Sequence, residues 1–151
     1  MIKKTIKKLV LEVGTLNRSN KEIAQLIKVE GAFKRAYRVD AEVKYVDAKY
    51  RNYIRPNVRG YHSGKNNMIV VFVDGNTRRN AETLLHELTH AYQNKYMHKQ
   101  LKKSKMLLNN NMVTYRDAWH EEHARHCAKL LINTFDFSLD LNNAMDYIIA
   151  A

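Results

Sequence analysis

The sequence predicts an α+β fold, because strand patterns and helix patterns occupy separate stretches of the chain. Apolar runs rich in β-branched residues lie between residues 37 and 73, whereas helical spacings fill much of the chain before and after them. With 151 residues, 45% of them hydrophobic, the chain suits one domain over residues 1–151 with a substantial core. We expect a small twisted sheet of about three strands packed on a helix, with further helices around it.

The first thirty residues contain one ambiguous segment and one predicted helix. Residues 1–13 fit an amphipathic helix by their apolar spacing and a strand by their β-branched content, so both interpretations stay open. Ser19 followed by Glu22 matches a capping box, and apolar residues at helical spacing follow it. This pattern predicts a second helix that ends near Gly31.

Three strands are predicted in the middle of the chain. Residues 39–45 alternate between apolar and polar side chains, which is typical of a half-buried strand. Residues 60–63 suggest a short strand, and a turn over residues 63–67 follows it. The continuous apolar run over residues 68–73 predicts a central, buried strand.

The remaining chain is predicted to form three helices. The first spans about Arg78 to Tyr96 and has leucines spaced for one buried face. Residues 98–112 are rich in Lys and Asn, and we expect an exposed loop there. Asp117 is expected to cap a helix that runs to about Asn133, and a last helix is expected over residues 139–149.

Positive charge is concentrated in the first part of the chain. Residues 1–65 hold 16 Lys and Arg against 6 Asp and Glu, a net charge of +10, whereas residues 66–151 are nearly balanced. Such a surface attracts polyanions, so non-specific contact with nucleic acid through residues 1–65 is one interpretation and a merely solvated surface is the other. Five tyrosines among these cations could stack bases, although packing within the sheet is the favoured interpretation: Tyr37, Tyr45, Tyr50, Tyr53 and Tyr61.

The composition also points to a protein of a reducing compartment, without a membrane partner. No apolar run approaches the ~18 residues that a membrane span needs. The basic N-terminus carries an apolar segment shorter than the ~7 residues typical of a signal peptide. Cys127 is the single cysteine, which excludes an internal disulfide, and we expect it to be an inert core residue.

The residues most informative about chemistry are His86, Glu87 and His90, which form an H-E-x-x-H motif. Two histidines four residues apart lie on one face of a helix, so their imidazoles can converge on one Zn²⁺ ion. Glu87 projects beside the metal, where its carboxylate can act as a general base on water. The motif therefore predicts a catalytic zinc site, and two solvated surface histidines are the less favoured alternative.

A catalytic zinc site needs a third protein ligand and one open position. The second histidine-rich helix offers candidates, and its core face is set by small and apolar residues such as Ala124. At about 100° per residue, His120 falls roughly 40° to one side of Ala124 and Glu121 roughly 60° to the other. Periodicity leaves both residues open. The other candidates are His98, Glu122, His123 and His126, which we expect to be solvated or to support the ligands.

These two segments together resemble compact zinc metallopeptidases of the zincin type. Residues 84–93 and 115–125 look like the two helices of gluzincins, including small phage and bacterial members, and of SprT-like and ImmA/IrrE-like proteins. The gluzincin frame Glu-x-x-Ala matches Glu121 and Ala124, but Arg125 follows where Asp or Asn is common. In SprT-like proteins a histidine is the third ligand, a role that His120 could take, although the glycines usual beside it are absent.

The resemblance implies a zinc-dependent hydrolase of peptide bonds. It assigns one Zn²⁺ ion to His86, His90 and Glu121, the base to Glu87, and a protein or peptide as substrate. It also implies a cytoplasmic location in a bacterial cell or a phage-infected host. Tyr115 could hydrogen-bond the tetrahedral intermediate, although packing is the favoured role. The alternative is a non-catalytic module of the same fold that binds nucleic acid or a protein partner.

Overall fold

The computed structural model describes residues 2–135 and confirms the predicted α+β fold. The helix expected over residues 139–149 lies outside the described residues. The elements are α1 (Ile2–Gly14), α2 (Ala24–Tyr37), β1 (Glu42–Asp47), α3 (Arg51–Ile54), β2 (Gly60–Ser63), β3 (Met68–Val73), α4 (Thr77–Tyr96), α5 (His98–Asn109) and α6 (Trp119–Ile132). Short 3₁₀ turns at Lys21–Ile23 and Ala48–Tyr50 precede α2 and α3.

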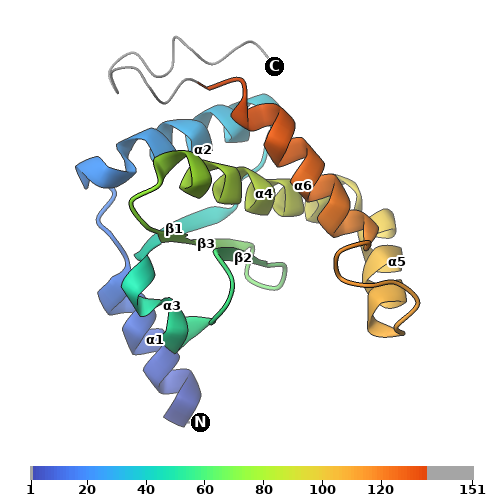
Figure 1. Cartoon of the computed structure of the whole chain (residues 1–151), viewed down its shortest axis with the longest axis horizontal. Coiled ribbons are helices and arrows are strands. Elements are labelled where there is room, and N and C mark those ends of the chain that lie inside the picture. Colours follow the sequence, from blue (N-terminus) through green and yellow to red (C-terminus); the bar gives the residue numbers. More distant parts are fainter. Residues whose placement is uncertain (1, 136–151) are drawn as a thin grey trace.

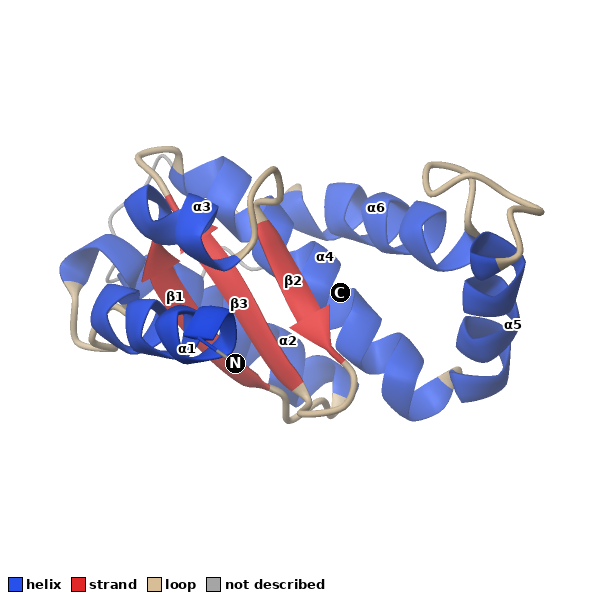
Figure 2. Ribbon diagram, turned by 90° about the horizontal axis from the view of Figure 1, so that it is seen from below, coloured by secondary structure: helices blue, strands red, loops and turns tan. Residues whose placement is uncertain are grey.

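The sheet is mixed and has the strand order β1-β3-β2. β1 runs parallel to β3, with Glu42 opposite Met68, and β2 runs antiparallel to β3, with Gly60 opposite Val71. The continuous apolar sequence of β3 fits its central position, since both faces of that strand are covered. Figure 2 shows the three strands with β2 at one edge.

Helices cover both faces of the sheet (Figures 1 and 2). Successive residues of β3 point to opposite faces, so Ile69 and Val71 pack in the larger core with α2 and α4. Val70 and Phe72 pack in a smaller core that includes side chains of α1 and α3. α6 packs against α4 on the side away from the sheet, and this places α4 between the sheet and α6.

Two helix boundaries differ from the sequence expectation. The side chain of Asn20, rather than Ser19, caps the turn before α2 by accepting the amide hydrogen of Glu22. α2 passes through Gly31 and ends at Tyr37, and the left-handed Arg38 follows it with a φ of 55°. A glycine inside a helix costs only about 1 kcal/mol relative to alanine, which the packing of neighbours such as Phe33 offsets.

The predicted loop over residues 98–112 is wrong, because residues 98–109 form α5. Lys and Leu are good helix formers, and this stretch has no proline or glycine to interrupt the helix. Its buried residues are Leu101 and Ser104, which face inward. Asp117 does not cap α6: its side chain accepts a hydrogen bond from Thr114 instead.

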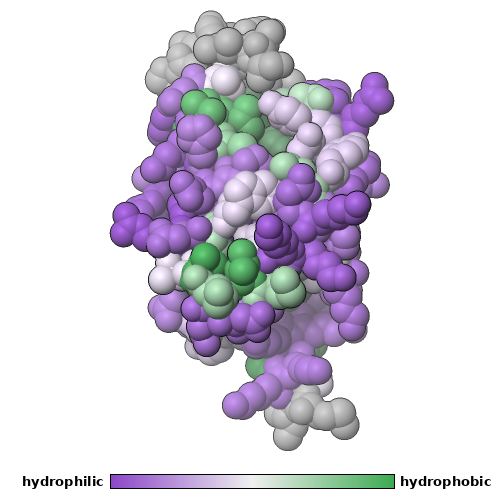
Figure 3. All heavy atoms as spheres, turned by 90° about the vertical axis from the view of Figure 1, so that its right-hand side faces the viewer, coloured by the Kyte–Doolittle hydropathy of each residue, from purple (hydrophilic) through white to green (hydrophobic). Residues whose placement is uncertain are grey.

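The open interpretation of residues 1–13 resolves to a helix, α1. No helix among residues 2–135 has both the length and the apolar character that a membrane crossing requires. Figure 3 shows the face on the α5 side of the molecule, where hydrophilic side chains cover most of the surface and hydrophobic ones gather in patches.

A buried carboxylate ties α2 to the sheet. Glu30 of α2 is buried and accepts a hydrogen bond from the Tyr45 hydroxyl of β1 at 2.8 Å. It also forms ion pairs with Arg18 at 3.0 Å and with Lys34 at 2.8 Å. Burial raises the pKa of Tyr45, so its hydroxyl remains a donor. Every oxygen of Glu30 therefore has a partner, as a buried charge requires.

We expect Tyr45→Phe to lower the free energy of unfolding by about 1.5–3 kcal/mol, the usual contribution of a buried hydrogen bond to a charged group. Urea unfolding at neutral pH measures the change. The matched control is Tyr53→Phe, which removes a hydroxyl from a side chain that is 64% exposed and should change stability by less than about 0.5 kcal/mol. Equal effects of the two substitutions would contradict the role given to the Glu30 contact.

Candidate metal centre

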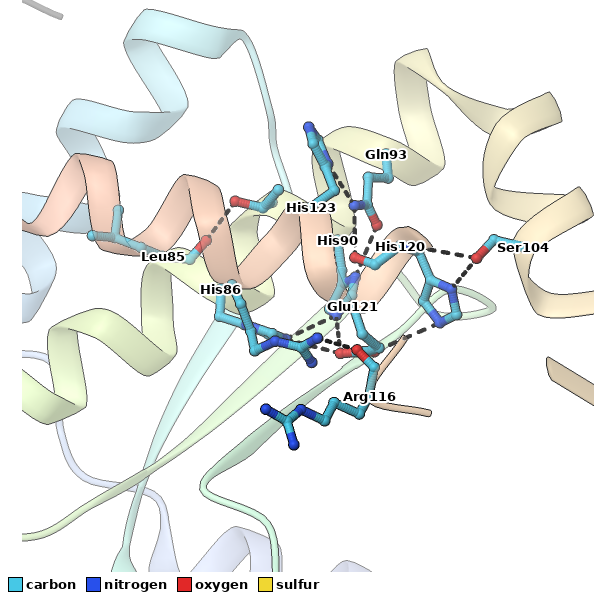
Figure 4. Close-up of polar contacts among 11 residues, drawn as sticks. Leu85, His86, His90, Gln93, Ser104, Arg116, His120, Glu121 and His123 are labelled. Atoms are coloured by element: carbon cyan, nitrogen blue, oxygen red, sulfur yellow. Dashed lines mark hydrogen bonds and ion pairs between the residues drawn. The ribbon is translucent and has the colours of Figure 1, made fainter. Parts of the chain in front are cut away.

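Two helices bring three ligand atoms together on one side of α4. His86 and His90 lie one turn apart on α4, and Glu121 comes from the first turn of α6. The two Nε2 atoms are 3.1 Å apart, and Glu121 Oε1 lies 3.0 Å from that of His86 and 3.2 Å from that of His90. Figure 4 shows the three side chains pointing toward one another.

These distances suit a single metal ion. Ligand atoms around a tetrahedral zinc, each at about 2.0–2.1 Å, are separated from one another by roughly 3.3 Å. The three separations of 3.0–3.2 Å come close to this value without any movement of the backbone. His86, His90 and Glu121 could therefore hold one ion and leave a fourth position open.

Gln93 fixes the orientation of the His90 ring from behind. Its Nε2 donates to the main-chain oxygen of His120 at 2.9 Å and lies 2.8 Å from His123 Nδ1. A carbonyl oxygen only accepts, so this contact determines which end of the amide is the NH₂ group. Gln93 Oε1 is therefore the atom 2.9 Å from His90 Nδ1, and it accepts the hydrogen there. The lone pair of His90 Nε2 is left to face the ion.

His120 lies beside the cluster rather than in it. Ser104 Oγ accepts the main-chain amide hydrogen of His120 at 3.2 Å and lies 2.7 Å from Nδ1 of the same residue. Ser104 thus holds the ring of His120 at Nδ1, and Nε2 of that ring lies 3.6 Å from Glu121 Oε2. The ring nitrogens of His120 are not among the ligand atoms of the cluster found in the described residues, so in this structure His120 is a neighbour of Glu121.

The other candidate residues lie farther from the cluster. His123 stacks on Trp119, with ring centroids 5.1 Å apart, and contacts Gln93. His98, Glu122 and His126 are exposed, and they do not belong to the ligand cluster found among the described residues. Cys127 is half-buried with its Sγ 3.5 Å from His123 Nε2, and burial raises the pKa of its thiol.

The charges of the cluster favour a cation. Burial would raise the pKa of the Glu121 carboxyl, but hydrogen bonds from His86 and His90 and their charges lower it well below its usual range. Burial would lower the pKa of His90, but its hydrogen bond to Glu121 and the charge of Glu87 raise it. The carboxylate is therefore ionised and draws positive charge toward the point where the three side chains meet. A metal ion can supply that charge in place of a proton.

Glu87 lies next to the cluster, and its carboxylate is not one of the three clustered ligand groups. The residue is only 7% exposed, and burial raises the pKa of its carboxyl while the two histidines partly oppose that shift. β2 packs closely against α4 beside Glu87, and Gly60 allows this because it has no side chain. A Cβ at this position would lie 2.8 Å from the main-chain oxygen of Val70 and 2.9 Å from Thr83 Cγ2.

Two cavities meet at Glu87 and form a cleft across the cluster. One has a volume of about 210 Å³ and lies toward α5, and the other has about 470 Å³ and lies toward α6. Both are lined by Val58, Gly60, Glu87 and Tyr115. Tyr115 is 62% exposed, which does not fit the favoured packing role, and burial of its hydroxyl together with the charge of Glu121 raises its pKa to about 12. The hydroxyl therefore keeps its hydrogen at neutral pH, and a hydrogen bond to Glu121 is among the causes of this shift.

Sequence reasoning brought out the three clustered residues and Glu87 but missed Gln93 and Ser104. Gln93 follows His90 by three residues, so helical spacing alone could have placed the two side chains on one face. Ser104 gave no such signal, because its stretch was expected to be a loop.

The comparisons with known proteins add no family. No family model, no curated protein and no solved structure matches the chain. The interpretation of the centre therefore depends on the sequence motif and the geometry.

Proposed function

We propose that this chain is a small zinc metallopeptidase of the zincin type that hydrolyses peptide bonds, with one Zn²⁺ ion held by His86, His90 and Glu121. The observation that carries the proposal is the convergence of the three ligand atoms within 3.0–3.2 Å beside a buried Glu87. A His₂Glu set with an open fourth position is a known arrangement of catalytic zinc. A cytoplasmic location in a bacterial cell or phage-infected host belongs to the same proposal.

Glu87 acts as the general base. When bound, zinc supplies Lewis-acid polarisation of a carbonyl and lowers the pKa of a water to about 7. The Glu87 carboxylate takes a proton from the attacking water and delivers it to the nitrogen of the leaving amine. Its raised pKa suits both steps, because a base whose pKa lies closer to neutrality also returns the proton more readily.

Tyr115 and the residues behind the ligands have supporting roles. With a pKa of about 12, the Tyr115 hydroxyl keeps its hydrogen and donates it to the substrate carbonyl oxygen as negative charge develops there. Gln93 orients His90 through a hydrogen bond, and His120 lies beside Glu121 with its Nε2 3.6 Å from the second carboxylate oxygen. Non-specific contact with nucleic acid through residues 1–65 stays a prediction, which the four exposed lysines near the start of α1 make reasonable.

Glu87→Gln should abolish hydrolysis and keep the metal. Glutamine has nearly the same shape but cannot accept the proton of the water, so we expect a loss of about 10²–10⁴-fold in rate. Zinc content by metal analysis and cleavage of a fluorescent peptide mixture measure the two effects. Glu122→Gln, at an exposed neighbour of Glu121, is the control. Cleavage at the wild-type rate by Glu87→Gln would remove the base assignment.

Glu121→Ala should weaken zinc binding more than His120→Ala does. Loss of a ligand removes a bond to the ion, whereas loss of an orienting residue typically costs about 10–100-fold in affinity. Competition with a chromogenic chelator measures both variants. A larger loss in His120→Ala, or no loss in Glu121→Ala, would assign the third ligand to His120 and the site to the three-histidine type.

Gln93→Ala should lower zinc affinity by about 10–100-fold, because the His90 ring loses the contact that orients it. The same chelator competition measures the change, and circular dichroism monitors the fold. Gln100→Ala, at an exposed position of α5, serves as the matched control and should keep the wild-type affinity. Unchanged affinity in Gln93→Ala would show that the amide does not orient the ligand.

A further inference from the structure

The cleft across the metal centre is lined by cationic side chains from several elements. They are Arg55 and Lys105 in the smaller cavity, and Arg59, Arg79, Arg125 and Lys129 in the larger one. Apart from Glu87 and Glu121 at the centre itself, Glu82 is the acidic residue that lines either cavity among residues 2–135. Outside the centre itself, cations therefore outnumber acids by two to none in the smaller cavity and by four to one in the larger one.

Most of this positive charge is not neutralised within the protein. Arg59 forms an ion pair with Asp74 at 2.8 Å. Arg125 donates to the main-chain oxygen of Arg116, a contact that leaves its charge in place. Within the described part of the chain, no carboxylate forms an ion pair with the remaining cleft cations, Arg55, Arg79, Lys105 and Lys129.

The centre itself adds little net charge to the cleft. With a divalent ion bound, the two negative charges of Glu121 and Glu87 would offset the charge of the ion. His62 lines the smaller cavity, but burial lowers its pKa to about 4, so its ring is neutral at pH 7. The field in the cleft at neutral pH is thus set by its arginines and lysines.

We propose that the cleft binds an acidic peptide segment, with Asp or Glu side chains on both sides of the scissile bond and more of them on the α6 side. This inference rests on the proposed hydrolysis for its choice of a peptide. The cations come from separate elements along the cleft, so they can meet carboxylates carried by successive side chains of an extended chain. The Glu87 carboxylate at the junction of the cavities disfavours a phosphate backbone there.

Binding of short labelled peptides to the zinc-loaded Glu87→Gln variant tests the proposal without cleavage. Three peptides are compared by fluorescence anisotropy, identical except that chosen positions carry Glu, Gln or Lys. We expect the Glu peptide to bind about tenfold more tightly than the Gln peptide and the Lys peptide to bind least. The preference should shrink as salt rises from about 50 to 200 mM, because these cations are accessible to solvent.

A charge reversal in the cleft provides the site-specific arm. Arg79→Glu with Lys129→Glu should abolish the preference for the Glu peptide, with zinc content unchanged. The matched control is Lys99→Glu with Lys102→Glu, which changes the net charge equally at exposed positions of α5 outside both cavities. This control should keep most of the preference. An equal loss of the preference in both double variants would show that the preference depends on the overall charge of the protein, and this would overturn the proposal.

Other outcomes separate this inference from the proposed function. Wild-type cleavage of peptides without preference for Glu would leave the peptidase in place and overturn the acidic segment. Tight, cleft-dependent binding of the Glu peptide without cleavage of any peptide would support the acidic segment and overturn the proposed peptidase function. A labelled oligothymidylate that binds more tightly than the Glu peptide, and is released by the cleft reversal, would assign the cleft to nucleic acid and overturn the proposal.

Discussion

Gln93 of α4 is fully buried against α6, and its side-chain amide contacts three polar groups. These are His90 Nδ1, the main-chain oxygen of His120 and His123 Nδ1. The NH₂ end satisfies a main-chain oxygen at the start of α6, and the oxygen holds the ring hydrogen of His90. Gln93 therefore joins α4 to α6 and occupies Nδ1 of His90, so that Nε2 is the ring nitrogen that faces the cluster. An apolar side chain here would leave buried polar groups of both helices without partners, which is costly in a protein interior. The spacing of α4 from α6, and hence of Glu121 from the histidines, depends on this contact.

The sheet contributes to the site as a platform rather than through its own chemistry. β3 is buried on both faces, so α4 rests on a layer that has little freedom to shift. β2 is one of the two edge strands, and its first residue borders the cleft beside Glu87. The clustered side chains are thus carried by helices, and packing on the strands determines where α4 lies.

Local patterns predicted the fold class, the three strands and the motif helix well. The apolar run over residues 68–73 fits a buried strand, and the H-E-x-x-H spacing fits one face of a helix. The stretch over residues 98–112 failed because its lysines and asparagines resemble a loop, while tertiary contacts of Leu101 and Ser104 stabilise a helix. The choice between His120 and Glu121 was also beyond periodicity, since both face the same helix. Only the folded chain shows that His120 contacts Ser104, sixteen positions away in sequence, while Glu121 lies in the cluster with His86 and His90.

Gly60 has a consequence for how variation in this chain should be interpreted. It carries no functional atom, yet the main-chain oxygen of Val70 and the methyl of Thr83 occupy the space of a Cβ. An alanine at this position requires the main chain at Val70 or the side chain of Thr83 to shift, and this changes how β2 packs against α4 beside Glu87. A mutational scan scored by growth or turnover would then rank Gly60 with Glu87 and the three clustered residues. The contribution of Gly60, however, is only that it has no side chain. In such data a structural position of this kind gives the same low score as a residue with a chemical role. Measuring the metal content of each variant distinguishes the two kinds of position.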